Sequence, residues 1–191
     1  MGELYINTLF GPMKTRARGN DNIYTPEDVA KKIVHHFKPK GKILEPCAGT
    51  GAFLKCLPKH SKWCEIEKGI NFFDYKDKVN WIVANPPFSK LSEFLIHSMK
   101  LSINIVFLIN LPGLFTVHRM RQLYIYKYGI KEILLLRQPT TFVQCGRQVA
   151  AVHLQKNYNS DIRISYDNDL VKSYTQKVTW QKKPKRHVKR K

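Results

Sequence analysis

Short apolar segments alternate with segments of helical periodicity along most of this 191-residue chain. Strands are predicted at residues 42–45, 63–67, 81–84, 103–110, 130–137 and 148–155. Helices are predicted at residues 26–37, 89–101 and 117–128, with a shorter one after residue 51. Such alternation favours an α/β sandwich: a mostly parallel sheet with helices on both faces. The last two strands are separated only by a loop, so we expect them to pair antiparallel.

The charge balance points to a polyanionic partner. The chain has 33 Lys and Arg against 14 Asp and Glu, a net charge of +19. So large an imbalance costs self-repulsion, and nucleic acid is the partner that best explains it. No apolar run approaches the roughly 20 residues that span a bilayer, and no secretory signal is visible. The four cysteines form no metal-type pair, so we expect neither a membrane nor a metal partner.

Three regions follow from the distribution of basic and apolar residues. Residues 1–22 are expected to form a basic arm, residues 23–157 the folded domain, and residues 158–191 a short extension and basic tail. A further short strand is predicted at residues 162–166. The tail would contact phosphates, or direct the chain to the nucleus in a eukaryotic host; otherwise we expect a cytoplasmic protein of bacterial, phage or viral context.

A glycine-containing turn directly follows the first predicted strand. The segment is Glu45-Pro46-Cys47-Ala48-Gly49-Thr50-Gly51. In parallel sheets, ligands bind beyond the carboxyl ends of the strands. Gly49 and Gly51 have no Cβ, so they let the backbone turn tightly and approach a ligand closely. This segment therefore predicts a ligand pocket.

A second motif, Asn85-Pro86-Pro87-Phe88, follows the strand at residues 81–84. This motif resembles that of enzymes that methylate the exocyclic amine of adenine, and its residue types fit that chemistry. The amine is a poor nucleophile because its lone pair is delocalised into the ring. The side-chain carbonyl of Asn85 and the main-chain carbonyl of Pro86 can each accept one amine proton, which favours a pyramidal nitrogen. Pro87 helps to fix the backbone, so both acceptors are already in position. The pattern is typical of methyl transfer to an exocyclic amine.

Together these motifs resemble the adenine-N6 DNA methyltransferases, a family with a Rossmann-like fold that uses S-adenosylmethionine. The resemblance covers about residues 20–156. It implies a seven-stranded, mostly parallel sheet with a terminal antiparallel strand, and the activity of a site-specific adenine-N6 DNA methyltransferase. Glu45, Pro46, Cys47, Gly49 and Gly51 match the first cofactor motif of that family.

The resemblance assigns further cofactor contacts. Tyr24 and Thr25 match a helix-start motif that implies contacts to the methionine end of the cofactor, and Asn85 would lie beside the same group. Glu65 matches the acid that accepts both ribose hydroxyls, with Glu67 as the alternative, and a carboxylate can accept from both members of a diol.

The segment that brackets the cofactor adenine departs from the family pattern. Asn71 stands where the family usually has an acid, so either Asn71 or Asp74 is expected to recognise the adenine amine. Phe72 would then pack against the adenine ring.

The substrate base must be flipped out of a duplex or be presented single-stranded. Phe88 offers a ring on which an extruded base could stack, and Phe142 and Arg147 are further candidate contacts to the nucleic acid. Only about 35 residues follow the catalytic fold, so a protein partner could supply target recognition.

Several alternatives remain open at this stage. The same chemistry on RNA is the nearest, followed by methylation of protein glutamine and by a non-catalytic nucleic-acid-binding subunit. The net charge of +19 favours nucleic acid over protein, and DNA is the leading substrate.

The basic tail gives the first test. Residues 182–191 contain seven Lys or Arg and no acid. Their removal should weaken nucleic-acid binding and flatten its dependence on salt, because fewer counterions are released. Binding isotherms at several salt concentrations measure this, and an unchanged slope would show that the tail makes no contact with phosphates.

Overall fold

The computed structural model describes residues 24–137 and 149–168. One seven-stranded sheet runs through this part of the chain in the order β2-β1-β3-β4-β6-β5-β7. Its strands are β1 (Ile43–Glu45), β2 (Lys62–Trp63), β3 (Val79–Ala84), β4 (Ser102–Asn110), β5 (Tyr128–Leu135), β6 (Val149–Lys156) and β7 (Arg163–Tyr166). The expected α/β sandwich with a mostly parallel sheet is confirmed.

Only β6 runs against the other strands. It pairs antiparallel with both β4 and β5, whereas β7 pairs parallel with β5. The antiparallel strand therefore lies inside the sheet rather than at its edge. Because β7 belongs to the same sheet, the folded unit continues past residue 157, where we expected it to end.

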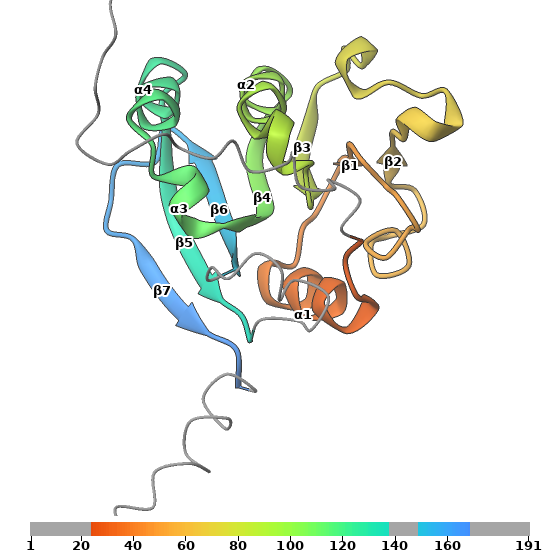
Figure 1. The fold of residues 1–191 in the computed structure, drawn as a ribbon, viewed down its shortest axis with the longest axis horizontal. Coiled ribbons are helices and arrows are strands. Elements are labelled where there is room, and N and C mark those ends of the chain that lie inside the picture. Colours follow the sequence, from red (N-terminus) through yellow and green to blue (C-terminus); the bar gives the residue numbers. More distant parts are fainter. Residues whose placement is uncertain (1–23, 138–148, 169–191) are drawn as a thin grey trace, which may run out of the picture.

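The helices lie on two sides of the sheet (Figure 1). They are α1 (Glu27–Phe37), α2 (Leu91–Leu101), α3 (Leu111–Leu114) and α4 (Val117–Ile125), with short 3-10 turns η1 (Ile66–Lys68), η2 (Phe72–Asp74) and η3 (Phe88–Lys90). In Figure 1, α2 and α4 lie together, whereas α1 lies apart from them, below β1. This arrangement gives the sheet one helical layer on each face.

Strand β4 shows how one sequence serves both layers. Successive side chains of a strand point to opposite faces. Ile105 and Phe107 belong to the hydrophobic cluster that contains residues of α2 and α4, and Val106 and Leu108 to the cluster that contains residues of α1. Both faces of this strand are buried, as its continuous apolar sequence indicates.

Three local predictions were wrong. Helix α1 begins at Glu27 rather than at residue 26, because Pro26 has an extended ψ of 144° and is the N-cap, without a side-chain hydrogen bond. Strand β2 ends at Trp63. The chain then turns into η1, whose start is capped by a hydrogen bond from the Glu67 amide to the Glu65 carboxylate. The segment after Gly51 forms turns rather than a helix.

The burial pattern of β4 predicts that substitutions at two of its isoleucines differ sharply in their effect on stability. Ile105 is fully buried, whereas Ile103 on the same strand is 48% exposed. Ile105→Ala should lower the free energy of unfolding by about 2–5 kcal/mol, because a cavity adds to the lost burial. The matched control Ile103→Ala should cost much less. Urea denaturation measures both, and equal losses would contradict this core.

Candidate active site

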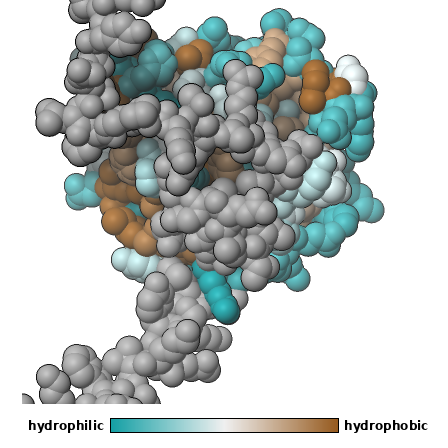
Figure 2. All heavy atoms as spheres, viewed as in Figure 1, coloured by the Kyte–Doolittle hydropathy of each residue, from teal (hydrophilic) through white to brown (hydrophobic). Residues whose placement is uncertain are grey.

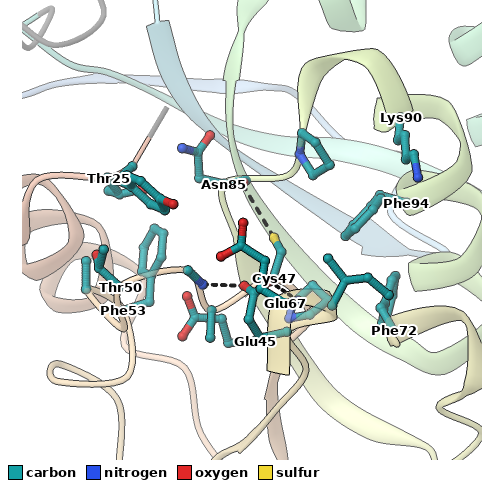
Figure 3. Close-up of a pocket in the computed structure, with 18 of the residues that line it drawn as sticks. Thr25, Glu45, Cys47, Thr50, Phe53, Glu67, Phe72, Asn85, Lys90 and Phe94 are labelled. Atoms are coloured by element: carbon teal, nitrogen blue, oxygen red, sulfur yellow. Dashed lines mark hydrogen bonds between the residues drawn. The ribbon is translucent and has the colours of Figure 1, made fainter. Parts of the chain in front are cut away.

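The two motifs found in the sequence meet at one cavity of about 430 Å³ at the carboxyl ends of β1 and β3. Its wall includes many of the expected residues: Tyr24, Thr25, Glu45, Pro46, Cys47, Gly49, Glu65, Asn71, Phe72, Asn85 and Pro87. Figure 3 shows Phe72 and Phe94 on one side of this space and Thr25, Thr50 and Phe53 on the other. A cavity of this size suits a nucleotide-sized ligand.

Glu65 ties the glycine turn to the neighbouring strand. Its Oε2 accepts a hydrogen bond of 2.6 Å from the Gly49 amide, and its Oε1 accepts one of 3.2 Å from the Glu67 amide. Gly49 has a φ of +50°, and a Cβ there would lie 3.1 Å from the Tyr24 ring. Glycine is therefore required at this position both by its backbone angle and by the approach of Tyr24.

The Cys47 thiol connects the glycine turn to the second motif. It donates to the main-chain oxygen of Asn85 at 3.4 Å (Figure 3). Burial, and then the charges of Glu45 and Glu65, raise the pKa of this thiol well above its usual value. Cys47 therefore stays protonated, which keeps it a hydrogen-bond donor.

Glu45 brings a second carboxyl group to the cavity. It is 1% exposed, and its Oε2 has no hydrogen-bond partner among the described residues. Burial, and then the charge of Glu65, raise its pKa to about 8, while a backbone hydrogen bond from Leu54 lowers it. Two carboxyl groups in one water-poor cavity favour a ligand that carries positive charge.

Aromatic rings form the other end of the cavity. Phe72 lies 5.1 Å from Phe94, and Phe73 lies 5.3 Å from the same ring, between ring centroids. The Asn71 side chain lines the cavity and accepts from the Phe73 amide at 3.1 Å, which starts η2. Asp74 is exposed and does not line the cavity, so of the two candidates only Asn71 is in place.

Some predicted residues lie elsewhere. Gly51, Pro86 and Phe88 do not line the cavity, and Phe88 instead packs, partly buried, against the cluster that includes α1. Phe142 and Arg147 lie outside the described residues, as do the basic arm and the tail.

Sequence reasoning missed several residues of the cavity wall, among them Phe53, Phe73 and Phe94. Phe94 lies in α2 three residues after the buried Leu91 and four before the buried Ser98, so its sequence position indicates a core residue. Only the fold shows that it also reaches the cavity.

Neither a metal site nor a membrane span is found in the part of the chain that the structure describes. Among residues 24–137 and 149–168, no group of three His, Cys, Asp or Glu could hold a metal ion. No helix within the same ranges is long and apolar enough to cross a membrane.

Comparison with known proteins supports the resemblance seen in the motifs. The model of the N-6 DNA methylase family matches residues 1–73, which include the glycine turn and Glu65. No curated protein sequence matches the chain. The match therefore covers the first cofactor motif but not Asn85.

Solved structures share the fold at low sequence identity. A protein assigned as a class I S-adenosylmethionine-dependent methyltransferase from Listeria monocytogenes superposes with a TM-score of 0.57 and 12% identity, over 84% of this chain and 72% of that one. The type I restriction enzyme EcoKI M protein gives 0.56 and 16%, over 73% and 45%. A protein assigned as an RNA methyltransferase from Pyrococcus horikoshii gives 0.50 and 13%, over 69% and 83%. These likenesses confirm the Rossmann-like methyltransferase fold.

The buried Glu45 predicts how stability depends on pH. Its pKa is about 8 in the folded protein and near 4.5 when exposed, so folding takes up a proton between these values. Stability of the ligand-free protein should therefore fall as pH rises from about 4.5 to about 8. The Glu45→Gln variant should lack this fall in stability, which thermal unfolding at several pH values measures. If stability depends on pH in the same way in both proteins, the assignment of the effect to Glu45 is contradicted.

Proposed function

We propose that this protein transfers the methyl group of S-adenosylmethionine to the N6 amine of adenine in DNA. The observation that carries the proposal is the hydrogen bond from the Cys47 thiol to the main-chain oxygen of Asn85, because it joins the turn that starts at Asn85 to the glycine-lined cavity. The match to the N-6 DNA methylase family supports it independently.

The cavity fits the cofactor in charge and in shape. S-adenosylmethionine carries an ammonium and a sulfonium group. These positive charges would favour the ionised form of Glu45, which lies beside Glu65 and otherwise stays largely protonated at neutral pH because its pKa is about 8. The free Oε2 of Glu45 would accept from the ammonium, and Glu65 retains lone pairs for the ribose hydroxyls. Phe72 and Phe94 form the apolar end where the adenine ring would pack.

The bound cofactor supplies a methyl group that is already activated by positive sulfur. The residues of this chain therefore need only to orient and desolvate the acceptor. The side-chain oxygen of Asn85, which lines the cavity, would accept a hydrogen bond from the amine and direct the nitrogen lone pair toward the methyl group. The main-chain oxygen of Pro86 would accept the second hydrogen bond, which requires a shift of the turn because Pro86 does not line the cavity. The N–C bond forms as the S–C bond breaks, and the amine then releases one proton to solvent.

The base must leave its stack to reach this cavity, at a cost of a few kcal/mol for a paired base. Phe88 packs against the protein in the ligand-free structure. A stacking role for Phe88 would therefore require a change of its side-chain position when the base binds. Lys90 is exposed and also lines the cavity, so its ammonium would bind a phosphate of the incoming strand.

An asparagine substitution tests the chemistry. Asn85→Ala should lower the turnover number by about 100-fold or more, because a preorganised acceptor is lost. Cofactor binding should change little. The matched control Asn159→Ala removes an exposed asparagine away from the cavity and should leave both unchanged.

The same assay identifies the acceptor. Purified protein is incubated with labelled S-adenosylmethionine and, separately, with DNA, RNA and protein, and the products are digested and identified by mass. N6-methyladenine in DNA is the expected product. Transfer only to RNA or to glutamine would overturn the proposed substrate, and cofactor binding without transfer would indicate a non-catalytic subunit.

A further inference from the structure

The edge of the sheet opposite the cavity carries a row of lysines. Every strand from β1 to β6 has an exposed lysine within two residues of its end at this edge. In the order of the strands along the chain they are Lys42, Lys62, Lys78, Lys100, Lys127 and Lys156. We call these six residues the lysine edge.

The topology explains why these residues gather. β1 to β5 run parallel, so their amino ends share one edge, and the antiparallel β6 brings its carboxyl end there. Neighbouring strands lie about 4.8 Å apart, so the row holds positive charges at close spacing. The acids within three residues of these lysines are Asp77, which is exposed, and Glu45 and Glu65, which are buried at the first cavity, so they are too few to balance the row.

A second cavity, of about 600 Å³, lies close to the lysine edge on the face of the sheet covered by α1. Trp81 and Asn104 in its wall pair across β3 and β4, and Asn104 pairs with Gln155, which directly precedes Lys156. The cavity therefore lies only one or two residues along the strands from the edge.

Aromatic rings lie in the wall of this second cavity beside polar and charged side chains. Phe37, Trp81 and Tyr158 all line it, and Lys131 places its ammonium 5.9 Å from the centre of the Tyr158 ring. Trp81 stacks on His153 at 4.9 Å between centroids. Burial lowers the pKa of His153 to about 4, so this histidine is neutral and adds no charge.

Two carboxylates lie in the cavity wall: Asp161, which is exposed, and Glu132, which is already engaged within the protein. Although burial alone would raise the pKa of Glu132, hydrogen bonds from Ser165 and His36 hold it below its usual value. Both bonds to Glu132 are 2.6 Å long, and Arg163 lies 3.9 Å from its other oxygen. Glu132 therefore does little to repel an anion.

We propose that the lysine edge and this aromatic cavity together form a second nucleic-acid-binding surface, separate from the active site. Single-stranded segments bind proteins through basic tracks that follow the phosphates and aromatic rings on which bases stack. The lysine edge supplies the track, and the cavity accepts one unstacked base against Tyr158 and Trp81.

The two surfaces lie at opposite ends of the strands. β4 has nine residues and spans about 30 Å, so the base in the active site and the segment on the lysine edge are different parts of the acceptor. The second surface would hold a long nucleic acid while the first modifies it. This proposal rests on the nucleic-acid partner of the proposed function.

Charge removal tests the lysine edge. Lys42→Gln/Lys62→Gln should weaken binding of a 30-nucleotide single-stranded DNA several-fold and reduce the slope of log affinity against log salt by about 1.4, the value for two lost phosphate contacts. Lys31→Gln/Arg121→Gln removes the same charge from exposed positions on α1 and α4 and should change the slope little. Equal effects of the two double variants would overturn the proposal.

Substitution of Tyr158 tests the cavity. Tyr158→Leu should weaken binding about fivefold or more, because base–aromatic stacking is lost. Tyr158→Phe keeps the ring and should restore the affinity. Failure of the phenylalanine variant to restore it, with both proteins folded by circular dichroism, would overturn the stacking role.

Two further measurements separate this proposal from its alternatives. Binding is measured by fluorescence anisotropy without cofactor, so it is independent of whether methyl transfer to DNA occurs. If transfer fails but the edge variants still lose affinity, the proposed function falls and the second surface stands. If they lose binding only to anionic phosphatidylserine vesicles and not to DNA, the surface is a membrane contact and the proposal is wrong.

Discussion

The hydrogen bond from the Gly49 amide to the Glu65 carboxylate is the constraint on which the candidate active site depends. It fixes the turn after β1 against the segment after β2, and Cys47 then fixes the same turn against Asn85. The segments that follow β1, β2 and β3 are thus held together around one cavity. The buried Oε2 of Glu45 has no hydrogen-bond partner among the described residues. It gives this cavity a preference for positive charge, because a bound cation would stabilise the ionised carboxylate that burial disfavours.

Parallel strands give the sheet two chemically different edges. Every strand except β6 ends at the edge with the glycine turn and Asn85, and it begins at the lysine edge. β6 runs the other way. One strand direction therefore separates a cavity that attracts a cationic cofactor from a basic row that suits phosphates. Figure 2 shows, on the one face in view, mostly hydrophilic side chains along the right-hand rim, with one hydrophobic group near its top, and further hydrophobic side chains on the left.

Several residues of the site could be predicted because their chemistry depends on nearby sequence. The strand before Gly49 and the strand before Asn85 are strongly apolar, so each motif could be placed at a strand end. Phe88 shows the limit of this reasoning. Its position in the motif suggests a contact with the base, but its ring packs against the cluster that includes α1, and Phe94 from α2 lines the cavity instead.

The sequence by itself determined the fold class, the two motifs and the excess of positive charge, because periodicity, residue type and composition are local properties of a chain. Only the tertiary structure decided that β6 inserts between β4 and β5 and that six lysines share one edge. It also decided that Glu45 is buried beside Glu65. These features depend on strand order and on contacts between residues far apart in sequence, which no local pattern records.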